Sequence, residues 1–501
     1  MASRADFTEE GWDLVLEGPT EAAVSANQSR PRPVLAESPS ASGSFGFRRL
    51  ARRQAVALSL ASLLLLLVTA TALAVTGDLT QPTGSAGCVS ETGSGPCADG
   101  HRLSGPRSVA VSADGKSVYV ASYEGNAVAR LNRNTTTGAI SQPVGTTGCI
   151  SQTGAGPCAD GHGLSGASDV AVSPDGKSVY VSSDISDAVA RFTRNTTTGA
   201  ISQPAAAAGC ISESGAGPCT DGHGLNGASD VVVSPDGKSV YVVSYLSNAV
   251  ARLNRNTTTG AISQPAGTAG CVSQTGAGPC ADGHALNNTT DVALSADGKG
   301  VYVSSDTSDA VARFARNTTT GAINQPAGAA GCISQTGAGP CADGHGLGGA
   351  YDVAVSPDGK SVYVASNESF AVARLNRNTT TGAISQPAGA AGCVSETGAG
   401  PCANGHGLPN PYGVVVSPDG KSVYAASPFS GAVALLTRNT ATGALAQPAG
   451  TTGCVSETGS GPCADGHALD GAEAVAVSPD GKSVYVASFL SDAVARFDRA
   501  P

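Results

Sequence analysis

Fourteen cysteines are the residues whose spacing first suggests chemistry. They form seven Cys-x8-Cys pairs, each displaced from the previous pair by 61 residues. The pairs are Cys88 and Cys97, Cys149 and Cys158, Cys210 and Cys219, Cys271 and Cys280, Cys332 and Cys341, Cys393 and Cys402, and Cys454 and Cys463. In an exported chain such pairs predict seven local disulfides. A histidine after each pair allows a rival zinc interpretation, but two Cys and one His are one ligand short of a closed site. The sequence favours disulfides and predicts no metal and no cofactor.

The seven histidines of the chain all occupy one equivalent position, and an acidic residue stands two places before most of them. The histidines are His101, His162, His223, His284, His345, His406 and His467, and Asn404 replaces the aspartate in one copy. A ring of Asp/His pairs could bind a metal or transfer protons. Catalysis, however, needs unlike groups that converge on one substrate, which identical copies do not supply. We interpret Asp-Gly-His as a turn whose side chains hydrogen-bond loop backbone.

Chemistry that needs unlike groups is expected where the copies differ, which happens at two positions in each copy. One is the link between the second and third predicted strands, and the other lies just before the first predicted strand. The candidates for ligand binding are Tyr123, Tyr245, Leu246, Phe429, Phe489, Leu490, Asp169, Asp230, Asp291 and Asp352. The candidates for catalysis are Arg107, Tyr351, Tyr412 and Glu473. No residue type or spacing identifies a nucleophile or base among them, and drift at unconstrained loop positions is the alternative explanation.

Four short strands in each 61-residue unit must position these side chains. In the unit at residues 137–197, runs at 168–173, 177–183 and 187–194 alternate apolar and polar residues. The tight turn Pro174-Asp175-Gly176 separates the first two runs. Gly-Ala-Ile-Ser-Gln-Pro at 138–143 is the fourth strand, and its proline suits a sheet edge. Four strands per regular repeat predict the blade of a β-propeller. The remaining stretch of about twenty residues, with both cysteines, is expected to be a long loop.

The two ends of the repeat region predict a closed ring. The last copy stops at Pro501, just before its fourth strand, and residues 76–82 at the beginning supply the missing strand. An open solenoid would need capping repeats with polar outer faces, and none is present. The fold class is therefore all-β, a seven-bladed propeller of four-stranded blades that is closed by the N-terminal strand.

The turn and strand residues of the repeat carry a family resemblance. Ser-Pro-Asp-Gly-Lys-Ser-Val-Tyr-Val at 173–181 and Ala-Val-Ala-Arg-Leu-Asn-Arg-Asn-Thr-Thr-Thr-Gly-Ala-Ile at 249–262 resemble the repeats of lactonase-like and YVTN-type bacterial propellers. The resemblance implies this fold, and it implies hydrolysis of a sugar lactone at the funnel of the ring. The matching residues are turn and core residues, so they assign no catalytic role. The cysteine segment departs from the family pattern and lengthens the unit.

The region before the ring predicts export. Residues 1–54 form a polar tail that ends in an arginine cluster and is expected to be disordered and cytoplasmic. Residues 55–75 are uncharged and long enough to span a bilayer as one hydrophobic helix. Arginines on its N-terminal side place residues 76–501 outside the cell. The protein is expected in the cell membrane as a single-pass protein, and the Ala72-Leu73-Ala74 sequence leaves cleavage and secretion as the alternative.

Composition and charge narrow the function. The net charge is −10 and no basic cluster occurs after residue 75, which argues against nucleic-acid binding. The disulfide loops and the variable positions are expected on one face of the ring, where they would contact a protein or glycan ligand. The sequence favours such a binding platform at the cell surface over an enzyme. The alternative is a lactonase-like hydrolase that uses the funnel.

Overall fold

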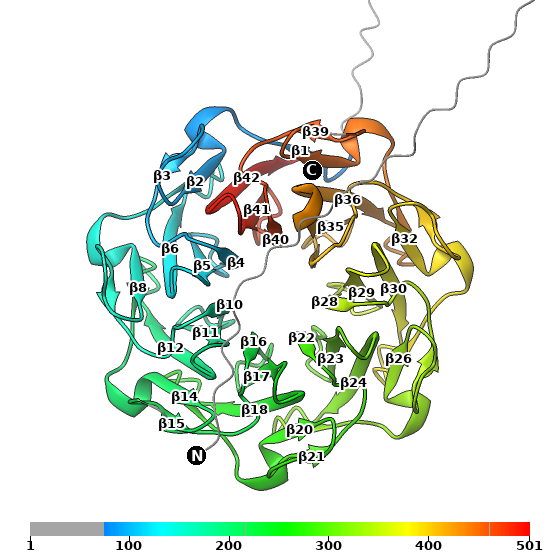
Figure 1. Ribbon diagram of the computed structural model, residues 1–501, viewed down its shortest axis with the longest axis horizontal. Helices are drawn as coiled ribbons and strands as arrows, with labels where there is room; N and C mark the ends of the chain where they lie inside the picture. Colours follow the sequence, from blue (N-terminus) through cyan, green and yellow to red (C-terminus); the bar gives the residue numbers. More distant parts are fainter. Residues whose placement is uncertain (1–74, 216, 460) are drawn as a thin grey trace, which may run out of the picture. The chain divides into compact units, whose positions relative to one another are not determined.

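The computed structural model describes residues 75–215, 217–459 and 461–501. In these residues seven β-sheets surround a central axis, and the chain visits them in order around the ring (Figure 1). Their regular structure consists of β-strands and short 3-10 helices, with no α-helix. The predicted tail at 1–54 and nearly all of the predicted hydrophobic helix at 55–75 lie outside the described residues. Within the described ranges, no helix has the length and apolar character needed to cross a membrane.

The first blade illustrates the sheet order from the axis outward. It begins with β4 (Pro106–Val111), β5 (Ser117–Ser122) and β6 (Ala127–Arg133). Two short strands then pair with β6, β7 (Ile140–Ser141) and β8 (Cys149–Ser151), and β9 (Ala159–Asp160) runs parallel to β8 at the outer edge. The predicted fourth strand at 138–143 is thus shortened to the two residues of β7, and the predicted cysteine loop in fact supplies two strands, β8 and β9. Each blade is a sheet of six strands, not four.

The next five blades repeat this order. The strands of the second and third blades are β10–β15 (Ala167–Val172, Ser178–Ser183, Ala188–Arg194, Ile201–Ser202, Cys210–Ser212, Thr220–Asp221) and β16–β21 (Ala228–Val233, Ser239–Ser244, Ala249–Arg255, Ile262–Ser263, Cys271–Ser273, Ala281–Asp282). Those of the fourth and fifth are β22–β27 (Thr289–Leu294, Gly300–Ser305, Ala310–Arg316, Ile323–Asn324, Cys332–Ser334, Ala342–Asp343) and β28–β33 (Ala350–Val355, Ser361–Ser366, Ala371–Arg377, Ile384–Ser385, Cys393–Ser395, Ala403–Asn404). Those of the sixth are β34–β39 (Gly413–Val416, Ser422–Ser427, Ala432–Arg438, Leu445–Ala446, Cys454–Ser456, Ala464–Asp465).

The seventh blade joins the two ends of the described chain. Its inner strands are β40 (Ala472–Val477), β41 (Ser483–Ser488) and β42 (Ala493–Arg499), and its outer strands are β1 (Leu79–Thr80), β2 (Cys88–Ser90) and β3 (Ala98–Asp99). β1 pairs with β42 in the register Leu79 to Arg499, and β2 pairs with β42 in the register Cys88 to Ala495. The predicted closure of the ring by the N-terminal strand is confirmed.

The turn between the two innermost strands explains why the Ser-Pro-Asp-Gly-Lys sequence recurs. The Ser173 hydroxyl accepts a hydrogen bond from the backbone N–H of Ser178, and the Asp175 carboxylate accepts one of 3.1 Å from the N–H of Lys177. Gly176 has φ of +66°, a conformation that glycine adopts without a steric penalty. The turn fixes the register of the hairpin, in which Val170 faces Val181.

Neighbouring blades are held together by apolar packing and by an ion pair at each interface, in which the arginine is buried and the aspartate is partly exposed. Between the first two blades, Tyr119 and Val128 pack with Phe192 in one core cluster. Arg194 of the second blade donates to both carboxylate oxygens of Asp114 in the first, at 3.0 Å, and to the Tyr119 hydroxyl at 2.7 Å. The Asp-Gly-Lys turn, interpreted from sequence only as a hairpin, therefore also fastens the next blade.

Candidate functional site

A β-bulge at the start of the innermost strand directs two consecutive side chains toward the axis. In a regular strand neighbouring side chains point to opposite faces, whereas a bulge inserts one unpaired residue and turns it. The register shifts in this way between Pro106 and Ser108, so Arg107 is the extra residue. Six blades have this bulge, and in the sixth blade Tyr412 stands just before the strand at Gly413. The seven bulge-position residues are Arg107, Ser168, Ser229, Thr290, Tyr351, Tyr412 and Glu473.

These residues line a central cavity of about 440 Å³. The cavity brings together all four candidates for catalysis that the sequence predicted. It also collects six of the ten candidates for binding, which are Tyr123, Tyr245, Asp169, Asp230, Asp291 and Asp352. A volume of this size is typical of small-molecule sites. Closure of the ring is essential to the site, because it places Glu473 of the last blade beside Arg107 of the first.

Four aspartates form one arc of the cavity wall. Asp169, Asp230, Asp291 and Asp352 follow one another in consecutive blades, and each carboxylate accepts a hydrogen bond from the backbone of the next blade's inner strand. Burial raises the pKa of Asp291 to about 6. Burial and neighbouring carboxylates raise the pKa values of Asp230 and Asp352 well above the usual range. These carboxyl groups are occupied in joining blades, which argues against a catalytic role.

The opposite arc contains a guanidinium group with open hydrogen-bonding capacity. Arg107 lies 3.8 Å from a Glu473 carboxylate oxygen and 3.9 Å from an Asp184 oxygen, both too far for a good hydrogen bond. Its guanidinium carbon sits 3.7 Å from the centre of the Tyr123 ring and 5.6 Å from that of Phe489. Arg107 Nε and Asp184 Oδ1 are buried and have no hydrogen-bond partner among the described residues. Both residues line the cavity.

Glu473 is the group in this arc that is suited to transfer protons near neutral pH. Burial raises its pKa to about 7, although the nearby Arg107 charge opposes the rise. Burial also raises the pKa of Asp184, with Arg107 again opposing. A carboxyl group with a pKa near 7 holds either protonation state at physiological pH, which is the property of a general acid or base.

Two tyrosines complete the cavity beside this group. Tyr351 and Tyr412 stack with ring centres 4.2 Å apart and an angle of 19° between the planes. They come from equivalent positions in adjacent blades, where three other blades have Ser or Thr. Aromatic faces of this kind suit a ring-shaped ligand with apolar faces and polar edges.

The remaining predicted residues lie outside the cavity. Leu246, Phe429 and Leu490 are exposed, with 57%, 73% and 65% of their surface accessible. Phe489, the neighbour of Leu490, packs near Arg107 as described above. The residues that the sequence did not propose include Asp184 in the cavity and the exposed Phe370. Each differs from the residues at its position in several other blades, and that difference was the available signal.

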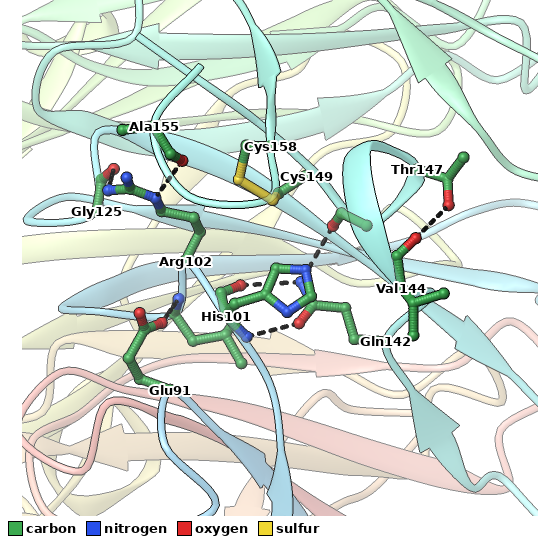
Figure 2. The surroundings of a disulfide bond; sticks show 12 residues. Glu91, His101, Arg102, Gly125, Gln142, Val144, Thr147, Cys149, Ala155 and Cys158 are labelled. Atoms are coloured by element: carbon green, nitrogen blue, oxygen red, sulfur yellow. Dashed lines mark hydrogen bonds between the residues drawn. A yellow bond between two sulfur atoms is a disulfide. The ribbon is translucent and has the colours of Figure 1, made fainter. Parts of the chain in front are cut away.

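The repeated cysteines and histidines are structural. All fourteen cysteines form disulfides with the predicted partners, so the zinc alternative is wrong. Figure 2 shows one of them near His101, whose N–H and C=O are both bonded by the Gln142 amide of the next blade, at 2.7 and 2.9 Å. The turn thus bonds through the histidine backbone. Each disulfide joins the first residue of one outer strand, such as Cys149 of β8, to the residue just before the outermost strand, such as Cys158 before β9. β8 lies at the outside of the ring in Figure 1.

The arrangement of potential metal ligands was also compared with the requirements of a metal site. Within them, no group of three or more His, Cys, Asp or Glu side chains is arranged to hold a metal ion.

Comparison with known proteins agrees with this architecture. The model of the family described as lactonase, 7-bladed beta-propeller matches residues 90–208 and 221–396. No curated protein matches the chain. Among solved structures, a putative 6-phosphogluconolactonase from Bacteroides uniformis ATCC 8492 is 19% identical over 68% of this chain and 83% of its own, with a TM-score of 0.47.

Two other solved structures are similar to this chain at comparable levels. A periplasmic gluconolactonase from Pseudomonas aeruginosa is 16% identical over 74% of this chain and 95% of its own, with a TM-score of 0.48. Hydrazine synthase of Kuenenia stuttgartiensis is 18% identical over 79% of this chain and 96% of its own, with a TM-score of 0.46. Likenesses this distant carry no argument about function, which must come from the cavity.

Proposed function

The chain belongs to the lactonase seven-bladed propeller family, and from the chemistry of its central cavity we propose that it binds a small polar ring compound there and hydrolyses a lactone. The observation that carries the proposal is the position of Arg107. Its guanidinium lies between Glu473 and Asp184 without a short hydrogen bond to either, and 34% of its side chain is accessible. A ligand carbonyl oxygen in the cavity would accept a hydrogen bond from this guanidinium.

The groups around Arg107 fit the hydrolysis of a lactone. In the proposed reaction the Glu473 carboxylate takes a proton from water, and the water oxygen attacks the carbonyl carbon. The charge that develops on the carbonyl oxygen faces Arg107. When the ring C–O bond breaks, the leaving oxygen takes the proton back from Glu473, and the product is a hydroxy acid. Tyr351 and Tyr412 are proposed to hold the ring against their stacked faces.

A lactone panel tests the proposal directly. The protein is assayed on five- and six-membered lactones by the acid that hydrolysis releases, with and without added divalent cations. We expect Glu473→Gln to lower kcat/KM by about 100-fold or more, since general-base catalysis contributes factors of this size. The rate of the native protein is expected to rise with pH through about 7, as Glu473 loses its proton.

The matched control is Glu368→Gln, which neutralises an exposed carboxylate outside the cavity. This variant is expected to hydrolyse lactones at the native rate. Absence of turnover on every lactone, or equal loss in both variants, would contradict the proposed reaction.

The sequence favoured a different function, a surface platform that binds a protein or glycan. One observation supports it. Exposed apolar side chains stand at the links between the second and third strands of several blades. Seven disulfides support an extracytoplasmic location, because such bonds persist in oxidising compartments. The proposed location remains the cell membrane, anchored by residues 55–75 with the propeller outside, or the secreted state if the segment is cleaved. Labelling of the intact cell surface with an impermeant reagent would separate these from an internal protein.

A further inference from the structure

Exposed apolar side chains surround the mouth of the cavity. Ile185, Leu246, Phe429 and Leu490 occupy equivalent positions in four blades, and between 57% and 73% of each is accessible. Phe370 stands two residues after the same position in a fifth blade and is 42% accessible. We call these five residues the apolar rim. Large exposed apolar side chains gathered at one place indicate a contact surface.

The apolar rim is continuous with the cavity. In the second and third blades the first residue of the link lines the cavity, as Asp184 and Tyr245 do, while the second, Ile185 or Leu246, is exposed. In the seventh blade the first residue, Phe489, lies 5.6 Å from the guanidinium carbon of Arg107, and the second, Leu490, is exposed. Both residues of these pairs lie over the glycine that precedes the innermost strand, for Tyr245 and Leu246 over Gly227. A ligand in the cavity would therefore leave it across the rim.

Phe370 shows that the rim departs from the repeat at a structural cost. Five other blades have Asn or Asp at this position, and its side chain bonds the backbone N–H of the next blade, as Asn126 does with Gly166 at 2.8 Å. Phenylalanine cannot make this bond. It also adopts φ of +50°, which is unusual for a bulky residue. Strain of this kind is typically found at functional sites.

We propose that the ligand of the cavity carries an apolar chain, with its polar ring held at Arg107 and its chain lying on the rim beside Phe370, Phe429 and Leu490. This inference rests on the proposed function and names its substrate class, lactones substituted with an alkyl or acyl chain. The three residues belong to consecutive blades, the fifth to the seventh. The same blades supply Tyr351, Tyr412 and Glu473 to the cavity, so head and chain occupy adjacent surfaces.

The charges of the rim argue against an anionic membrane as its partner. Glu124 and Glu368 occupy the equivalent link positions in two blades, and the whole chain has a net charge of −10. Binding to anionic lipid needs a basic surface, which is absent from this rim. A neutral hydrocarbon chain meets no such repulsion.

Ligands with a graded chain test the inference. γ-Lactams with no chain, a propyl chain or a hexyl chain resist hydrolysis, and their affinities are measured by calorimetry on the full chain below the concentration at which they aggregate. Each added methylene that is buried is expected to raise affinity about two- to fourfold. The corresponding γ-lactones are assayed in parallel for kcat/KM.

The variant and its control both use residues that other blades already tolerate. In Phe370→Asn/Phe429→Thr/Leu490→Thr, the asparagine and one threonine occur at the same positions elsewhere, as Asn126 and Thr307, so folding is expected to be retained. This variant should lose the gain in affinity with chain length. Val144→Ala removes an apolar group that is 88% exposed but lies away from the rim, where other blades have alanine, and it should keep the gain.

The outcomes distinguish the two proposals. If chain-free lactones are hydrolysed and a longer chain gives no gain, or the same gain in the rim variant, the inference is overturned while the proposed function stands. If neither lactones nor lactams of any length bind, the proposed function itself fails. If the rim variant instead abolishes self-association of the protein, the rim is a contact between copies and the inference is overturned.

Discussion

Replacement of Glu473 by glutamine should stabilise the folded protein above neutral pH. The pKa of Glu473 is about 7 in the fold against 4.5 in an exposed state, because burial disfavours its charged form. The stability from this group is complete below about pH 4.5 and is lost as the pH rises through 7. The difference of about 2.5 pKa units corresponds to about 3 kcal/mol, since each unit is about 1.4 kcal/mol.

The glutamine side chain imitates the protonated carboxyl group and does not ionise, so Glu473→Gln removes this penalty. At about pH 8 we expect the free energy of unfolding of the variant to exceed that of the native protein by about 3 kcal/mol. At about pH 5 the difference should fall below about 1 kcal/mol, because this pH is close to 4.5 and the unfolded state gains little free energy from the ionisation of Glu473. Guanidinium titrations at the two pH values, with the disulfides intact, measure both quantities.

The sign of the effect is what tests the reasoning. If Arg107 stabilised the Glu473 carboxylate more than burial destabilises it, the variant would be less stable at pH 8. That result, or an equal difference at both pH values, would refute the assignment of a raised pKa. Glu368→Gln is the control, and its exposed side chain should give no change at either pH.

Three further predictions follow from the same structure. Asp230→Asn should stabilise the protein at neutral pH and have little effect near pH 4, because burial and adjacent carboxylates raise the pKa of Asp230. The amide oxygen still accepts the hydrogen bond from the Val292 N–H. Denaturant titration at both pH values checks this, and lower stability of the variant at neutral pH would contradict it. Asp114→Asn should lower the free energy of unfolding by about 3 kcal/mol, since it leaves the buried Arg194 without its partner, whereas Asp465→Asn, on an exposed carboxylate, should have no effect. Thiol titration of the denatured, unreduced protein should find no free thiol in the ring, and Cys149→Ser/Cys158→Ser should cost about 3 kcal/mol of stability; fourteen reactive thiols would refute the disulfide framework.

The repeat made the ring predictable, because the number of blades and their closure follow from counting residues. Equal spacing of 61 residues fixes the number of blades, and the missing last strand fixes the closure of β1 on β42. Closure in turn makes Glu473 and Arg107 neighbours, although 366 positions separate them in the chain. Candidates were chosen where the blades differ in sequence. Most of these residues line the cavity, although the sequence does not show where their side chains point.

Features that depend on local geometry were not predictable. A β-bulge has no strong sequence signature, so the sequence did not show that Arg107 and Ser108 both face the axis. β7 and β8 both pair with β6 but are separate strands, because the short 3-10 turn at Gly145–Thr147 lies between them. The sequence pattern predicted only a loop there. The ion pair of Arg194 with Asp114 joins residues of two blades whose individual patterns are already explained by strand and turn.

The comparison of the two arcs of the cavity shows how a repeated fold can acquire a specific site. In the second to fifth blades the residue after the bulge is aspartate, and the four carboxylates preserve the repeat by bonding the next strand. In the sixth and seventh blades Gly413 and Ala474 replace it, and these inter-blade bonds are lost. The same part of the ring contains Tyr412, Glu473 and, in the next blade, Arg107. The departures from the repeat therefore coincide with the open hydrogen-bonding groups, which is the pattern expected if selection has exchanged local stability for a binding site.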